Sequence, residues 1–79
     1  MEMIAPRNIL FRELRVAILK HGYYAKDVAR ALHMTEGAMS ARLNGKTPWS
    51  LSEVYSVCDL LSIPYAEIPA YWTKKDVTA

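Results

Sequence analysis

The sequence has a single cysteine, Cys58, and no long apolar run. One cysteine excludes an intramolecular disulfide, so we expect the chain in a reducing compartment. The N-terminal region MEMIAPRNILFRELR mixes acids, bases and a proline and has no apolar segment of signal-peptide length. The longest strictly apolar run at this end, VAIL, is far too short to span a bilayer. We therefore expect a soluble, cytoplasmic protein.

Residues suited to metal binding or catalysis are also scarce. The two histidines, His21 and His33, have no acidic residue at ligand spacing, and with one cysteine they cannot form a set of four metal ligands. Only three glycines are present, and none forms part of a glycine-rich phosphate loop. A surface or turn position accounts for His33 better than catalysis. We expect neither an enzyme nor a bound metal or other cofactor.

What the sequence does contain is apolar residues at helical spacing. Hydrophobic residues make up 52% of the 79 residues, which is enough for one compact core. No segment is typical of a strand, so the expected fold class is all-α, a compact single domain of five helices. Its core is expected at residues 7–72, followed by a frayed tail at 73–79. The expected helices are 7–20 (with Leu10, Leu14, Ala17 and Ile18 inward), 24–32, 36–43, one from Ser50 with Leu51, Val54, Cys58 and Leu61 inward, and a short one that begins at Pro64 and is interrupted at Pro69.

The third and fourth helices have clear start signals, and the third also has a clear stop signal. Thr35 is a good N-cap for the third helix, and the preceding Met34 can pack on Met39 as a hydrophobic staple. Asn44 and Gly45 end this helix, because glycine readily adopts the left-handed conformation of a helix stop. The run SLSE from Ser50 reads as a capping box for the fourth helix. Cys58 lies on the apolar stripe of that helix, which favours a buried, inert thiol.

The third helix has an unusually bare outer face. Its exposed positions are expected to be Glu36, Gly37, Ser40, Ala41 and Asn44, none of them bulky. Only three residues separate it from the second helix, so the two must cross steeply, with the small Ala29 at their contact. This arrangement is that of a helix-turn-helix, whose second helix enters the DNA major groove. The alternative is an ordinary surface helix in a bundle.

The run AKDVARALHMTEGAMSARLNGK resembles the helix-turn-helix of Cro/C1-type repressors, the lambda-repressor-like or XRE family. Ala29, Met34, Thr35, Ser40 and the Asn-Gly-Lys ending occupy positions of the family pattern. The run TPWSLSEVYSVCDLLSIP resembles the family's fourth helix and its lead-in, and EIPAYW resembles the ending of a subgroup of very small phage and prophage proteins. The resemblance covers roughly residues 8–72. It implies a lambda-repressor-like domain with DNA-binding residues at Ala25, Lys26, Thr35, Glu36, Gly37, Ser40, Ala41, Asn44, Lys46 and Thr47.

The sequence departs from the family pattern at three positions. Many relatives carry glutamine at the places of Ala25 and Glu36, and glutamate can only accept, for instance from a cytosine amino group. His33 stands where glycine is common, in a turn that often needs a positive φ.

Between residues 20 and 46 there are five basic and two acidic residues, a mild basic excess that is compatible with binding to a polyanion.

Two functions follow from these patterns. The first is sequence-specific binding of double-stranded DNA in the major groove by a phage or prophage transcriptional regulator, associated with the nucleoid of a bacterial host. The second is a protein-interaction module that kept the fold, such as an antitoxin-like or phage-control partner. No small-molecule ligand and no membrane partner is expected.

A regulator of this size is expected to bind a palindromic operator as a homodimer. The apolar and aromatic tail favours a dimer interface there, and the alternative is that Tyr71 and Trp72 fold back on Val16 and Leu19 of the first helix. The residues expected at the dimer interface are Ile63, Tyr65, Ile68, Tyr71 and Trp72.

Overall fold

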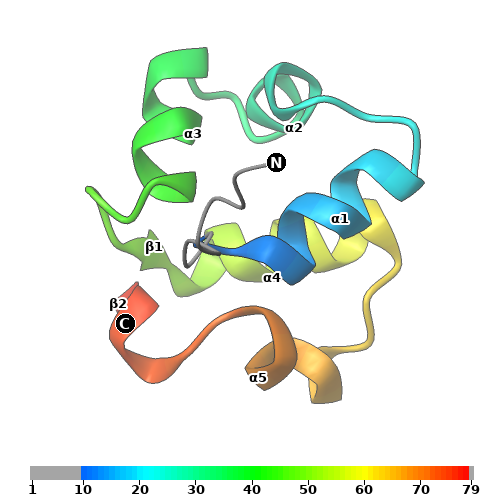
Figure 1. Cartoon of the computed structure of the whole chain (residues 1–79), viewed down its shortest axis with the longest axis vertical. Coiled ribbons are helices and arrows are strands. Elements are labelled where there is room, and N and C mark those ends of the chain that lie inside the picture. The colour runs from blue at the N-terminus through cyan, green and yellow to red at the C-terminus, as the bar shows by residue number, and fades with distance from the viewer. Residues whose placement is uncertain (1–9, 79) are drawn as a thin grey trace, which may run out of the picture.

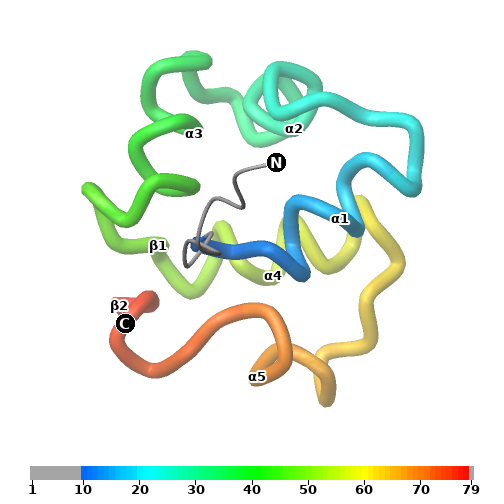
Figure 2. Tube along the Cα trace, viewed as in Figure 1, coloured from blue at the N-terminus to red at the C-terminus, as the bar shows by residue number. Residues whose placement is uncertain are grey.

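A computed structural model gives the arrangement of the chain and describes residues 10–78. The second and third helices lie together at one end of the molecule and the fifth helix at the other, with the first and fourth helices between them (Figure 1, Figure 2). The described part is mostly helical, which agrees with the all-α expectation, and it adds a short two-stranded sheet. The elements are α1 (Arg12–Lys20), α2 (Ala25–Ala31), α3 (Glu36–Leu43), β1 (Trp49–Ser50), α4 (Leu51–Leu61), the 3₁₀ turn η1 (Tyr65–Glu67), α5 (Ile68–Tyr71), the 3₁₀ turn η2 (Lys74–Asp76) and β2 (Val77–Thr78).

The first helix begins later than its apolar pattern indicates. Phe11 precedes α1 with φ at 57°, in the left-handed region, so the helix starts at Arg12. The Phe11 ring meets the edge of Trp49 with centroids 6.0 Å apart, and this packing takes the place of a further helical turn. Leu10 is 50% exposed and is not an inward helical residue, which corrects that expectation. Residues 7–9 of the expected first helix lie outside the described residues.

The start and stop signals of α3 are confirmed. The Thr35 hydroxyl oxygen accepts from the amide of Ala38 at 3.0 Å, and Asn44 and Gly45 end the helix, with Gly45 at φ 75°. His33 lies between α2 and α3 at φ 60°, the left-handed conformation that glycine adopts most readily. Met34 is half-buried against the core.

The capping box of α4 is confirmed in both directions. The Ser50 hydroxyl accepts from the Glu53 amide at 3.2 Å, and a Glu53 carboxylate oxygen accepts from the Ser50 amide at 3.0 Å. Cys58 is buried, as expected, and burial raises the pKa of its thiol. Leu51 differs from the expected inward stripe, because it is 41% exposed.

The core is built around two tryptophans. Trp49 and Trp72 are both buried and meet edge to face with centroids 5.6 Å apart. Tyr55 lies outside the core, 38% exposed. The remaining buried residues are Leu14, Ile18, Val28, Ala29, Met39, Leu43, Val54, Val57, Cys58, Leu61 and Ile63.

No helix within residues 10–78 is long and apolar enough to cross a membrane.

The tail is ordered where fraying was expected. Val77 and Thr78 of β2 pair in parallel with Trp49 and Ser50 of β1, and η2 precedes them. The Asp76 carboxylate accepts from the amide and the hydroxyl of Thr73, which holds the η2 turn. The expectations of a frayed tail and of no strand are therefore wrong for residues 73–78.

Pro69 does not interrupt the last helix. It lies in the first turn of α5, where the missing N–H breaks no helical hydrogen bond. A helical turn is present from Pro64 onward, as expected, but its first part is 3₁₀ and only the residues from Ile68 are α-helical.

Candidate functional site

The outer face of α3 is exposed and free of bulk. Glu36, Gly37, Ser40 and Asn44 are exposed, whereas Met39 and Leu43 on the opposite face are buried at 0% and 3%. Of the residues expected on this face, Ala41 alone is half-buried. The structure therefore places the predicted face of α3 on the surface.

Helices α2 and α3 pack against each other, and the small side chain of Ala29 is buried beside the turn that joins them. Ala29 is 1% exposed, and its carbonyl accepts from the amide of Met34 at 2.9 Å in the turn between the helices. The left-handed conformation of His33 turns the chain within this short connection. Ala29 is therefore buried beside the turn that joins α2 to α3.

The N-terminus of α2 carries a basic and an acidic side chain close together. Ala25 and Lys26 are exposed, and the Lys26 ammonium lies 5.9 Å from the centroid of the Tyr24 ring. However, the Asp27 carboxylate accepts from the Tyr24 amide at 2.7 Å. A negative charge therefore already stands at this helix start and satisfies one of its free amides.

Arg15 joins α1 to the end of α3, a contact that sequence reasoning missed. Its Nη2 donates to the carbonyl of Leu43 at 2.7 Å and to Oδ1 of Asn44 at 3.1 Å, and its Nε donates to the carbonyl of Leu10 at 2.9 Å. The Nδ2 of Asn44 in turn donates to the hydroxyl of Ser40 at 3.2 Å. Two exposed residues of the α3 face are thus connected to α1.

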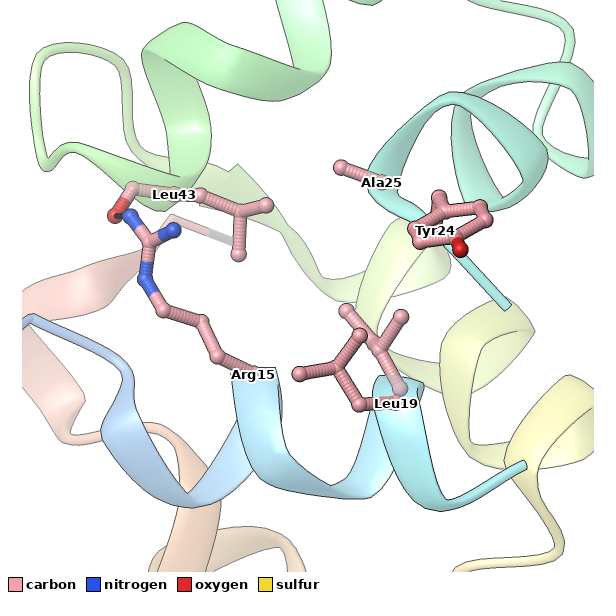
Figure 3. A pocket seen from close by; sticks show the side chains of 6 residues that line it. Arg15, Leu19, Tyr24, Ala25 and Leu43 are labelled. Carbon is pink, nitrogen blue, oxygen red and sulfur yellow. Dashed lines mark hydrogen bonds between the residues drawn. The ribbon is translucent and has the colours of Figure 1, made fainter. Parts of the chain in front are cut away.

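Arg15 also forms part of the wall of a surface hollow of about 220 Å³ beside α3. Figure 3 shows its guanidinium end beside the Leu43 backbone, with Leu19, Tyr24 and Ala25 on the other side of the hollow. The lining is mainly apolar: Ile18 and Leu43 are buried and Leu19 is 62% exposed. The hollow lies between α1, the start of α2 and the end of α3.

A second arginine, Arg42, ties α3 to α4. Its Nε and Nη2 donate to the two oxygens of Glu53 at 2.8 and 3.0 Å, and its Nη1 donates to the Ala38 carbonyl at 3.1 Å. Partial burial raises the pKa of Glu53, but the hydrogen bonds from Arg42 and from the Ser50 amide outweigh it and the net shift is downward. The sequence showed Glu53 as a capping residue and carried no signal for this ion pair.

The loop after α3 presents Lys46 to solvent. The amides of Lys46 and Thr47 both donate to the carbonyl of Ala41, at 2.8 and 3.3 Å, so the loop is held against the end of the helix. Lys46 is exposed and Thr47 is half-buried. Since Glu53 pairs with Arg42, the basic excess of this region rests mainly on exposed Lys20, Lys26, Arg30 and Lys46.

Two of the five tail residues that were expected at a dimer interface are buried in the core. Ile63 and Trp72 are 6% and 2% exposed, so they belong to the core and cannot cover a partner; that part of the prediction is wrong. Ile68 and Tyr71 are half-buried. The tail does fold back: Trp72 packs on Trp49 and α5 contacts α1, while Val16 and Leu19 stay 43% and 62% exposed.

Tyr65 is the one residue of that set that stays well exposed, at 51%. The centroid of its ring lies 4.7 Å from the centroid of the Tyr55 ring, and its hydroxyl donates to a carboxylate oxygen of Asp59 at 2.7 Å. This hydrogen bond to a carboxylate raises the pKa of Tyr65.

Within residues 10–78, no three histidine, cysteine, aspartate or glutamate side chains gather in a way that could hold a metal ion. His21 lies at the end of α1 with its Nδ1 3.0 Å from the carbonyl of Ala17, and its ring stacks beside Tyr23. The candidate functional surface is the α3 face with its flanking loops.

Comparison with known proteins places the chain in a family. No curated protein and no solved structure matches it. A family described as "Protein of unknown function (DUF739)" matches residues 10–75, which include all five α-helices and the α3 face. The chain therefore belongs to the DUF739 family.

Proposed function

We propose that this protein binds double-stranded DNA sequence-specifically, as a Cro/C1-type helix-turn-helix regulator of the kind found in phages and prophages. The observation that carries the proposal is the exposed face of α3, where Gly37, Ser40 and Asn44 present little bulk. Small side chains let a helix backbone approach the base edges of the major groove. The close α2–α3 packing at Ala29 supports the same assignment.

The polar groups on this face suit two kinds of DNA contact. Glu36 can accept a hydrogen bond from a cytosine amino group, and Ser40 and Asn44 can donate or accept at base edges or phosphates. Exposed Lys46 follows the helix at a position suited to a phosphate oxygen, with Thr47 beside it. Phosphate contacts position the protein, whereas the base contacts supply the specificity.

The proposal includes a homodimer on a palindromic operator. A helix of eight residues reaches only a few base pairs, and two-fold pairing places two such helices about 34–36 Å apart on one side of the duplex. Because Ile63 and Trp72 are buried, the interface has to use other surface, and the exposed Tyr55–Tyr65 pair is available for it. Sedimentation velocity of the intact protein with and without DNA tests this part.

A protein-binding module is the second candidate. It is favoured by the acidic groups at the starts of the two helices, since Asp27 caps α2 and Glu36 is exposed in the first turn of α3. Carboxylates at these points oppose the approach of phosphates.

Salt dependence distinguishes the two candidates. The assay is fluorescence anisotropy of labelled duplexes, among them the DNA that flanks the gene, titrated with protein at several salt concentrations. A DNA-binding dimer with about two phosphate contacts per protomer should show a log–log slope of roughly −3 to −4. Absence of duplex binding even at low salt contradicts DNA binding and favours the protein-binding module.

A further inference from the structure

The guanidinium of Arg15 determines which way the Asn44 side chain faces. Arginine can only donate hydrogen bonds, so the atom of Asn44 that lies 3.1 Å from Nη2 has to be the amide oxygen. Turning the amide over would bring its NH₂ group against another donor. The Leu43 carbonyl, 2.7 Å from the same nitrogen, keeps the arginine in place.

This orientation also determines the direction of the hydrogen bond between Asn44 and the Ser40 hydroxyl. With its oxygen toward Arg15, Asn44 directs its NH₂ group to the Ser40 hydroxyl oxygen at 3.2 Å. A hydroxyl oxygen that accepts from Asn44 directs its own hydrogen elsewhere, and the structure records no further partner for it within residues 10–78. The second Nδ2 hydrogen of Asn44 is likewise directed away from Arg15. The Ser40 and Asn44 positions of the α3 face therefore present donors.

We propose that Arg15 is a positioning residue that sets Asn44 and Ser40 as hydrogen-bond donors to acceptor groups of DNA. The inference rests on the proposed function and adds the chemistry of the contact. The acceptors are atoms on a base edge, such as guanine O6 and N7, or a phosphate oxygen, all of which carry lone pairs that can face the donors. Glu36, at the other end of the face, carries the opposite polarity because a carboxylate can only accept.

A double-mutant cycle tests this inference on the intact protein. Arg15→Met keeps an apolar stem but has no donor, and Asn44→Ala removes the amide. Each variant should weaken duplex binding about tenfold. If Arg15 acts through Asn44, the double variant should lose about ten- to twentyfold rather than the roughly hundredfold expected of independent contacts.

The salt slope separates positioning from a direct contact. Arg15→Met should leave the slope of the wild-type protein unchanged, because a positioning arginine neutralises no phosphate. Arg12→Met is the matched control: it removes the same charge from an exposed position on the same helix and should bind normally. Circular dichroism establishes the temperature at which all variants are folded. If Arg15→Met does not fold, Arg15→Lys replaces it in the cycle with the same expected coupling, since lysine lacks the planar fork that makes these contacts.

Modified duplexes identify the acceptor. Loss of wild-type binding to 7-deazaguanine at one position supports a base-edge contact, and loss at one methylphosphonate linkage supports a phosphate contact. In either case the affinity for the modified duplex should no longer respond to Asn44→Ala.

Three results overturn the inference. Losses that multiply in the cycle, together with a salt slope lowered by about two (about one for each protomer of the dimer), mean that Arg15 touches a phosphate itself. A wild-type protein that binds no duplex overturns the proposed function and this inference with it. Binding without coupling overturns the inference alone.

Discussion

The ion pair between Arg42 and Glu53 should set much of the stability of the α3–α4 junction. Glu53→Gln keeps the size of the side chain and its capping oxygen but removes the charge and turns one acceptor into a donor that faces Arg42. The pair is largely covered, with side-chain exposures of 18% and 21%. Breaking a fully buried pair costs about 3–5 kcal/mol, and the remaining exposure here reduces the expected cost to roughly 2 kcal/mol. For a domain of this size that corresponds to a melting temperature lower by about 8–16 °C.

The cost should depend on pH in a defined direction. The pKa of Glu53 is lowered from its ordinary value of 4.5, so the stabilisation by this carboxylate is fully present above that pH. It is lost as the pH falls through the folded-state pKa, where the wild-type carboxylate takes up a proton. Because glutamine does not titrate, the difference between the wild-type protein and Glu53→Gln should shrink steadily in acid below pH 4.5.

Urea unfolding followed by circular dichroism at pH 7 and at several acidic pH values measures both effects. Glu67→Gln is the control, because it removes a carboxylate from an exposed position and should change the free energy of unfolding by less than about 0.5 kcal/mol. A similarly small change for Glu53→Gln refutes the reasoning. So does a difference from the wild-type protein that is constant across the acidic range.

Three further substitutions or reactions at single residues and one truncation have expected outcomes. Ser40→Trp should keep the melting temperature, since Ser40 is exposed, but abolish duplex binding in a gel-shift assay; normal binding would exclude α3 from the interface. Lys46→Ala should weaken binding to all duplexes alike and lower the salt slope by about two, about one for each protomer of the dimer, whereas a loss confined to one base position would indicate sequence reading. A chain that ends at Pro69 should be unfolded by circular dichroism because it lacks buried Trp72, and a folded product would contradict that core assignment. Cys58 should react with a thiol reagent only in urea, because it is 1% exposed and its pKa is raised; rapid reaction of the native protein would contradict its burial.

The local signals of the sequence determined α3 and α4. Thr35 caps the third helix, Gly45 ends it, and Ser50 and Glu53 cap the fourth, all through hydrogen bonds or backbone conformations within a few residues. Such interactions depend on neighbours in the chain, so they can be recognised without the fold. The exposed face of α3 follows from the same helical periodicity.

Only the tertiary structure decided the start of α1, the place of the tail and the partners of the α3 face. The left-handed conformation of Phe11 accompanies a contact with Trp49, and β2 forms because Trp49 and Val77 meet across the fold. Arg15 reaches Asn44 across 29 positions of sequence. A side chain such as arginine is compatible with solvent or with a partner, and its own identity does not select between them. The choice is made by which segments the core brings together, because the free energy of each contact depends on residues that are distant in the chain.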